Sequence, residues 1–320
     1  MIYMESEFKS LRERMIRGAK QGIEISYKNE EHILMQAINA YNETSRSYNL
    51  LFERLSEWYG IYFPEIKIQN PKTLAQLTIH MLSKEPDKEE ILKIVEDEGK
   101  ADSIISKAQA TIGRKQEGDE AQAIMAFAKM GIEMQNTLDN IGEYIKSASG
   151  RILPNTTYLT DERIAAELLA KAGSLERLAT MPAGTIQLLG AEKALFKHIK
   201  FGSKPPKYGI LFKVPQVSNA QKERKGRIAR LYATKISIAL KADYFTKNFI
   251  AESLKANIES SIKRINEKEI KPRKQNSQQW KRPDRNEFRR DYKDGRENSF
   301  RGGGRRQGGR HGGRNNSRRN

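Results

Sequence analysis

ILMQAINAYNETSRSYNLLFERLSEWYG, residues 33–60, is the stretch that most constrains the fold of this chain. Its core positions follow one another at alternating steps of four and three residues, which is the spacing of a helix that packs lengthwise on another helix. Asn29 can cap this helix, and Gly60 is expected to end it. Such a helix would be roughly 45 Å long. The positions of this first seam are Leu34, Ile38, Tyr41, Ser45, Tyr48, Phe52, Leu55 and Tyr59.

A second seam with the same spacing occurs farther along the chain and ends at Ser149-Gly150. Two long seams separated in this way most simply pair antiparallel, which predicts a coiled-coil hairpin over residues 29–150. Residues 1–28 predict only a short amphipathic lead-in helix. The positions of the second seam are Ile124, Phe127, Gly131, Met134, Leu138, Ile141 and Ile145.

The stretch 151–268 has a helical pattern interrupted by glycine and proline, which predicts several short helices in a compact domain. Its last helices are expected at Lys222–Leu240 and Tyr244–Ile265, and a short extended pair at Tyr208–Val214. The predicted fold class is therefore all-α, with a long antiparallel coiled-coil hairpin followed by a compact helical domain.

Positive charge is concentrated in the segment that begins GAEKALFKHIKFGSKPPKYG, residues 190–209. Between Gly190 and Arg230 there are eleven Lys/Arg against two acids, a net charge of +9 out of +18 for the whole chain. Four of the lysines lie along one helical face, whereas Leu195 and Ile199 are expected to face a core. A nucleic-acid backbone is the usual partner of such a surface, and a solvated basic face is the alternative. The four lysines are Lys193, Lys197, Lys200 and Lys204.

The C-terminal stretch 269–320 is a second basic region, and its last twenty residues read RGGGRRQGGRHGGRNNSRRN. A segment of this composition cannot bury enough apolar surface to offset the entropy of ordering, so we predict a disordered Arg/Gly-rich tail. Such tails bind RNA without reading its sequence, although a purely solubilising role is the alternative.

Several classes of function lack support in the sequence. The chain has no cysteine, and its four histidines (His32, His80, His198 and His311) are scattered, so no metal site is expected. There is no phosphate-binding loop, dinucleotide fingerprint or nucleophile elbow, so no enzyme activity and no cofactor are expected. The charged N-terminus and the lack of a long apolar run predict a soluble, intracellular protein with no membrane partner.

Four stretches resemble the Nop-domain family, and most closely the archaeal Nop core protein of box C/D methylation-guide ribonucleoproteins. They are residues 33–66, ILPNTTYL at residues 152–159, residues 173–212 with GAEKALFK, and KGRIARLYATKISIALKADYF at residues 225–245. The resemblance covers residues 29 to about 265 and identifies 151–268 as a Nop domain.

The resemblance implies an RNA-binding scaffold. In the family the coiled coil mediates self-association, and the Nop domain binds a box C/D guide RNA together with a kink-turn-binding protein. A fibrillarin-type methyltransferase, which uses S-adenosylmethionine, then docks and carries out 2′-O-methylation of rRNA or tRNA. The expected location is the cytoplasm for an archaeal-type protein and the nucleolus for a eukaryotic one.

The family's RNA-contacting GAEK element corresponds to Gly190, Ala191, Glu192 and Lys193. Its ALFR element reads ALFK here, and Lys197 lacks the bidentate fork of an arginine. Together with the charge pattern, the resemblance predicts an RNA site with twelve members. They are Gly190, Ala191, Glu192, Lys193, Lys197, Lys200, Lys204, Lys207, Arg224, Lys225, Arg227 and Arg230.

The N-terminus departs from the family pattern, because only about 28 residues precede the first seam where the family carries a globular domain that contacts the methyltransferase. Two alternatives to the guide-ribonucleoprotein scaffold therefore stay open. One is a Nop paralogue in a ribonucleoprotein without a methyltransferase. The other is a general RNA-binding or chaperone protein that acts through its basic tail.

Overall fold

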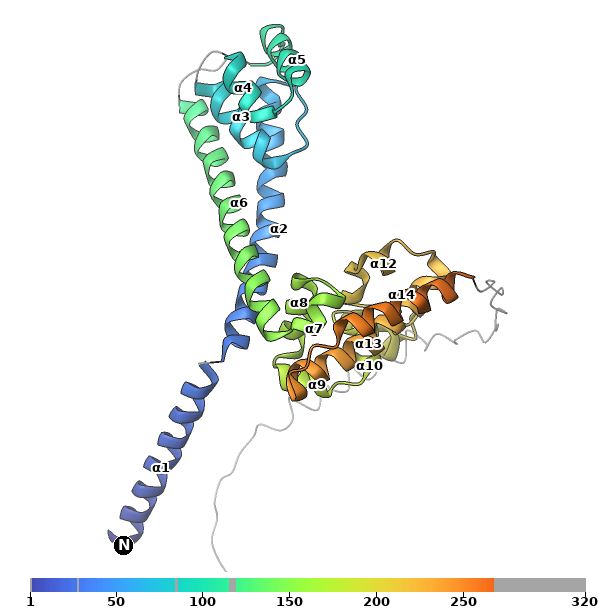
Figure 1. Cartoon of the computed structure of the whole chain (residues 1–320). Helices are drawn as coiled ribbons and strands as arrows, with labels where there is room; N and C mark the ends of the chain where they lie inside the picture. Colours follow the sequence, from blue (N-terminus) through green and yellow to red (C-terminus); the bar gives the residue numbers. More distant parts are fainter. Residues whose placement is uncertain (1, 28, 84–85, 115–118, 268–320) are drawn as a thin grey trace, which may run out of the picture. The chain divides into compact units, whose positions relative to one another are not determined.

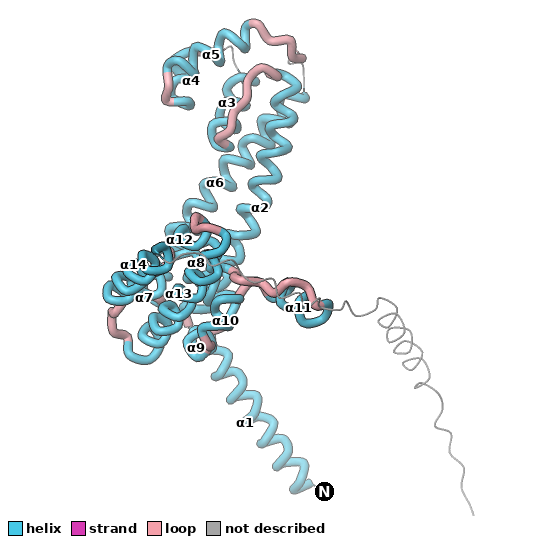
Figure 2. Tube along the Cα trace, turned by 90° about the vertical axis from the view of Figure 1, so that its right-hand side faces the viewer, coloured by secondary structure: helices cyan, strands magenta, loops and turns pink. Residues whose placement is uncertain are grey.

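The computed structural model describes residues 2–27, 29–83, 86–114 and 119–267, and the predicted disordered tail at 269–320 lies outside them. Every regular element in these ranges is helical, which confirms the all-α class (Figure 2). None of the described helices is long and apolar enough to cross a membrane. The first helix, α1 (Ile2–Tyr27), covers the predicted lead-in.

Two long helices, α2 (Glu30–Tyr62) and α6 (Asp119–Ile152), lie side by side and run antiparallel (Figure 1). At one end Arg151 Nε lies 3.5 Å from Glu30 Oε2, and at the other the Tyr62 hydroxyl donates to Glu120 Oε2 at 3.2 Å. Asn29 caps α2 as predicted, but the helix continues past Gly60 to Tyr62, so the predicted end was wrong by two residues. The seam positions that are buried are Leu34, Ile38, Tyr48, Leu55, Tyr59, Ile124, Gly131, Leu138 and Ile145.

Three shorter helices follow α2 along the chain and share a core with its second half. They are α3 (Pro71–Ser83), α4 (Lys88–Val95) and α5 (Glu98–Gln109), and Asp87 and Asp97 cap the last two. Glu65 ties the chain after α5 back to the end of α2, because its carboxylate accepts from the backbone of Ile112 at 2.9 Å and the hydroxyl of Thr111 at 2.8 Å. These two hydrogen bonds hold the pKa of Glu65 below its usual range.

A second core forms around α13 (Lys222–Lys241), whose apolar face is buried. The start of α2 and the end of α6 belong to it, since Leu34, Ile38 and Ile145 pack in the same cluster. The helices that share this core with α13 are α7 (Pro154–Leu159), α8 (Glu162–Ala172), α9 (Leu175–Thr180), α10 (Ala183–Leu188), α12 (Pro215–Ser218) and α14 (Ala251–Glu267). The boundary at residue 150 between coiled coil and Nop domain stays a prediction.

Two local predictions in this region were wrong. Residues 210–213 form the 3-10 turn η1 (Ile210–Lys213) in place of the expected extended pair, because Pro215 starts α12 directly afterwards. The expected helix from Tyr244 is broken into the π-helical turn η2 (Ala242–Thr246) and α14. Lys247 separates them with a left-handed backbone at φ 57°.

The break after α13 is held by a buried carboxylate, Asp243, which is 1% exposed. Its Oδ1 accepts from the backbone and side-chain amides of Asn155 at 2.9 and 2.8 Å. Its Oδ2 accepts from the backbone amide and hydroxyl of Thr156 at 3.0 and 2.7 Å. Asn155 Oδ1 in turn accepts from the Ile250 amide at 2.7 Å. One side chain therefore connects the start of α7 to the segment between α13 and α14.

The described residues divide into two units, and residues 192–206 belong to the smaller one. This smaller unit holds α11 (Glu192–Phe201) and the residues that follow it, while the larger holds all the other described helices. Each unit is described by itself below.

Candidate nucleic-acid interface

In the larger unit, two glycines allow the segment 207–210 to lie directly against the end of α10. Gly209 N donates to Gln187 O at 2.9 Å, Ile210 N donates to Leu189 O at 2.8 Å, and Gln187 Nε2 donates to Lys207 O at 2.6 Å. Gly190 has φ +89°, and a Cβ there would lie 2.7 Å from Ile210 Cγ1. A Cβ on Gly209 would overlap the carbonyl oxygen of Leu189. This close approach places Lys207 beside the predicted Gly190-Ala191 element.

Gly209→Ala is expected to destabilise this pairing, because the new methyl group meets backbone atoms that cannot move aside as a side chain would. We expect a loss of about 1–3 kcal/mol in the free energy of unfolding, measured by urea denaturation. Gly184→Ala is the matched control, since a Cβ there has no atom within 4 Å. Equal stability of the two variants would contradict the assigned role of Gly209.

The start of α13 supplies the other basic residues of the predicted site that belong to the larger unit. Arg227 and Arg230 are exposed, while Ile228 and Ala229 between them are buried. The stem of Lys207 lies 3.7–4.0 Å from the position that a Cβ on Gly226 would take, so Lys207 lies against this helix. The structure thus brings Lys207, Gly190 and the first turns of α13 into one region of the unit.

Lys225 is engaged within the protein. Its Nζ donates to Ser218 O at 2.6 Å and lies 5.1 Å from the centroid of the Phe212 ring. Its ammonium is therefore less available to a phosphate than those of the exposed cations. Lys213, which contributed to the charge count, is likewise paired with Glu167 at 2.5 Å.

In the smaller unit, α11 has no buried residue. The side chains of Glu192, Lys193, Lys197 and Lys200 are exposed, as is that of Lys204 after the helix. The expectation that Ile199 faces a core was wrong, because its side chain is 75% exposed.

Exposed apolar rings accompany these lysines. Phe196 and Phe201 are both more than half exposed, and Lys200 Nζ lies 5.6 Å from each ring centroid. His198 Nδ1 lies 2.5 Å from Ser203 O, and Gly202 ends the helix with φ +61°. Aromatic rings beside cations are typical of surfaces that bind nucleic acid, where charge meets phosphate and rings stack on bases.

The predicted site residues are therefore divided between the two units. The larger unit holds Gly190, Ala191, Lys207, Arg224, Lys225, Arg227 and Arg230, and the smaller unit holds Glu192, Lys193, Lys197, Lys200 and Lys204. Among the described residues there is no cluster of His, Asp or Glu suited to a metal ion.

Comparison with known families matches residues 40–264 to the family described as "Nop: snoRNA binding domain, fibrillarin". This chain belongs to the Nop family. It is 32% identical over 255 residues to a NOP5 family protein of Methanocaldococcus jannaschii, covering 79% of this chain and 61% of that protein. It is 35% identical over 280 residues to nucleolar protein 56 of Dictyostelium discoideum, covering 82% of this chain and 52% of that protein.

The chain thus spans about half the length of the curated relatives that it matches. A crystal structure of a fibrillarin/Nop5p complex contains a chain that is similar at 23% identity and a TM-score of 0.47, with 81% of this chain and 78% of that chain covered.

Within the Nop-matched region, the sequence reasoning missed one feature. The rings of Tyr208 and Phe212 stack at a centroid distance of 4.9 Å with 12° between their planes. The i, i+4 spacing of the two aromatics was the available signal, but it was lost when the segment was predicted to be extended. The pair stiffens the segment that carries Lys207, and it provides the ring above which Lys225 lies.

Proposed function

We propose that this chain is the RNA-binding scaffold of a box C/D guide ribonucleoprotein. The observation that carries the proposal is the cationic region of the larger unit. Lys207 lies against the start of α13, which carries the exposed Arg227 and Arg230, and the segment that follows Lys207 packs beside Gly190. The proposal is supported by the match of residues 40–264, which include this region, to a family described as a snoRNA binding domain.

The chemistry of the region suits a folded RNA backbone. Exposed cations at the start of α13 attract phosphates, and Gly190-Ala191 offers a backbone that an RNA strand can approach closely. The α11 surface would add Lys193, Lys197 and Lys200 to the same RNA. Half of such a site is expected to come from a kink-turn-binding protein, because phosphate contacts alone carry no sequence information.

Catalysis is assigned to a partner. In this proposal a fibrillarin-type methyltransferase supplies the S-adenosylmethionine chemistry, and the present chain positions the RNA and is not an enzyme. The long pair α2–α6 is the proposed self-association surface. The complex would function in the nucleolus of a eukaryotic cell, as the name of nucleolar protein 56 indicates for that relative, or in the cytoplasm of an archaeal cell.

The test is conditional RNA affinity. A gel-shift titration of a labelled C/D RNA with this chain should show tight binding only after the kink-turn-binding protein has been added. Equal affinity with and without that protein would overturn the proposal. Adding a fibrillarin-type methyltransferase to the assembled complex should then give a larger species, and its failure to join would favour a Nop paralogue that works without a methyltransferase.

A further inference from the structure

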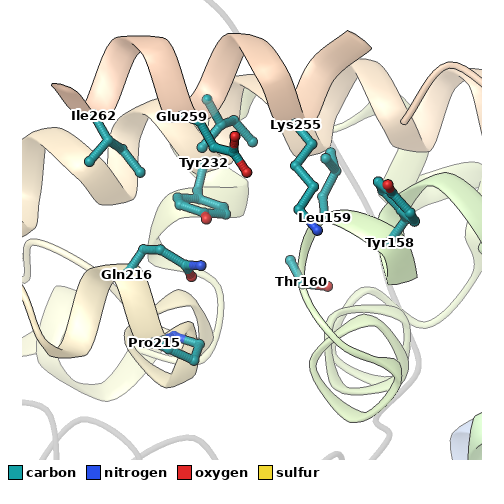
Figure 3. A pocket seen from close by; sticks show the side chains of 10 residues that line it. Tyr158, Leu159, Thr160, Pro215, Gln216, Tyr232, Lys255, Glu259 and Ile262 are labelled. Atoms are coloured by element: carbon teal, nitrogen blue, oxygen red, sulfur yellow. The ribbon is translucent and has the colours of Figure 1, made fainter. Parts of the chain in front are cut away.

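A pocket of about 140 Å³ opens beside α14, between α7, α12 and α13 (Figure 3). All of its lining belongs to the larger unit. Arg230 and the pocket residue Tyr232 are two positions apart on α13, so their side chains point about 200° apart around the helix. The pocket therefore lies on a different side of α13 from the exposed cations of the proposed RNA interface.

An exposed aromatic ring and a cation, Tyr158 and Lys255, line the pocket, and the ring of Phe249 lies beside Tyr158. Tyr158 is 43% exposed, and its ring meets the 55%-exposed ring of Phe249 edge-on at 5.6 Å. Lys255 Nζ lies 4.7 Å from the centroid of Tyr158 (Figure 3). Exposed rings beside a lysine are the elements with which proteins hold single-stranded nucleic acid.

The wall of the pocket is polar on one side. The Gln216 amide can both donate and accept, and the Glu259 carboxylate can only accept. The Tyr232 hydroxyl can donate at neutral pH, as any tyrosine can, and burial, with a smaller effect from Glu259, raises its pKa to about 12. Thr160 donates its hydroxyl proton to Thr156 O at 2.9 Å, which leaves its oxygen as an acceptor.

The volume of the pocket limits the size of the group that can bind in it. A cavity of ~150 Å³ holds benzene, so a pocket of this size accommodates one six-membered ring. A pyrimidine base has this size, and its edge carries the N–H and C=O groups that Gln216, Glu259 and Tyr232 complement.

We propose that this pocket binds a single unpaired pyrimidine base of RNA, with Tyr158 stacking on the adjacent base and Lys255 near the phosphate. A phenylalanine side chain of a protein partner has a similar size, but it would leave the polar wall without hydrogen-bond partners. The pocket is independent of the guide-RNA interface proposed above, and it would give the domain a second contact with RNA.

The test is fluorescence anisotropy of the full chain with labelled single-stranded octamers of cytidine, uridine and adenosine. We expect the unaltered chain to prefer both pyrimidine octamers. Tyr158→Ala and Lys255→Ala should each weaken pyrimidine binding by about tenfold. Lys263→Ala removes the same charge from an exposed position on the same helix, outside the pocket lining, and should change the affinity by less than about twofold. Every variant carries the same Arg/Gly-rich tail, so differences among them report the pocket.

Two results would overturn the proposal. One is equal affinity of the Lys255→Ala and Lys263→Ala variants for the pyrimidine octamers. In that case a side chain of a protein partner would be the better candidate for the group that binds in the pocket. The other is ultraviolet crosslinking of oligouridine only to peptides from residues 268–320, with none to Tyr158 or Tyr232.

A further experiment tests the pocket proposal separately from the scaffold proposal. Arg227→Ala with Arg230→Ala should weaken assembly on the kink-turn complex and leave the pyrimidine preference intact. Loss of the preference in that double variant would show that one surface explains both activities, and the pocket proposal would fall while the scaffold proposal stood.

Discussion

Asp243→Ala is expected to lower the free energy of unfolding by about 3–5 kcal/mol, the largest effect of any single substitution considered for this protein. The carboxylate is almost fully buried and accepts four hydrogen bonds from Asn155 and Thr156. Alanine would leave four buried donors at the start of α7 without their acceptor, and each unsatisfied donor costs about 1–3 kcal/mol before local relaxation. The change would also detach α7 from the segment that leads into α14.

Urea unfolding followed by circular dichroism measures the loss in the free energy of unfolding. An unchanged m-value would show that the variant and the unaltered chain undergo the same unfolding transition. Asp161→Ala is the matched control, because Asp161 caps α8 from an exposed position and its carboxylate accepts from the Arg163 amide at 2.6 Å. Removal of such a cap costs about 1 kcal/mol. A loss for Asp243→Ala no larger than that of the control would contradict the structural role of the buried carboxylate. Asp243→Asn should also be destabilising. The side-chain NH₂ group of asparagine would replace one of the two acceptor oxygens, and it would face N–H or O–H donors of Asn155 or Thr156.

Simultaneous replacement of Lys207, Arg227 and Arg230 by alanine is expected to weaken binding to the kink-turn complex roughly a hundredfold at low salt. Each side chain is exposed and is assigned to a phosphate, so each loss should also reduce the slope of log affinity against log salt by about one. The triple variant should therefore have a slope about three smaller, and its affinity should approach that of the unaltered chain as salt increases.

Gel-shift titrations at several salt concentrations measure both quantities. A triple variant at Lys171, Lys241 and Lys263 removes the same charge from exposed positions elsewhere in the larger unit, and it controls for the net charge of the chain. The slope of log affinity against log salt is compared between the two triple variants. An unchanged slope in the Lys207/Arg227/Arg230 variant, or equal slopes in the two variants, would contradict the assignment of this surface. Lys225 is left out of the set because its ammonium is held by Ser218 O and the Phe212 ring.

The long helices show how much of the fold can be predicted from local pattern. Seam positions such as Leu34, Leu55, Ile124 and Ile145 are all buried, because a heptad spacing keeps them on one face whatever the partner is. The cap at Asn29 was also predicted, since it depends on a hydrogen bond between neighbours in the chain. The end of α2 was placed two residues early, because Gly60 does not adopt the left-handed backbone of a helix-ending glycine and the helix continues to Tyr62.

The candidate site shows the limit of that approach. Charge and family resemblance selected the residues, but they did not separate the exposed Arg227 and Arg230 from Lys225, which is bound within the protein. The helical spacing also predicted that Ile199 is buried, because an apolar position on an amphipathic helix is usually covered by another part of the protein. Whether it is covered depends on what packs against the helix, and no residue of α11 is buried.

The sequence by itself determined the all-α class, the two long helices, membership of the Nop family and the concentration of positive charge between Gly190 and Arg230. These properties follow from residue spacing, composition and motifs, all of which depend on residues that are close together in the chain. The tertiary structure alone decided the rest. Asp243 finds its partners 87 and 88 residues away, Gly209 admits the Leu189 backbone, and the pocket beside Lys255 is assembled from four separate helices. Each of these depends on close packing between distant segments, which no local pattern encodes.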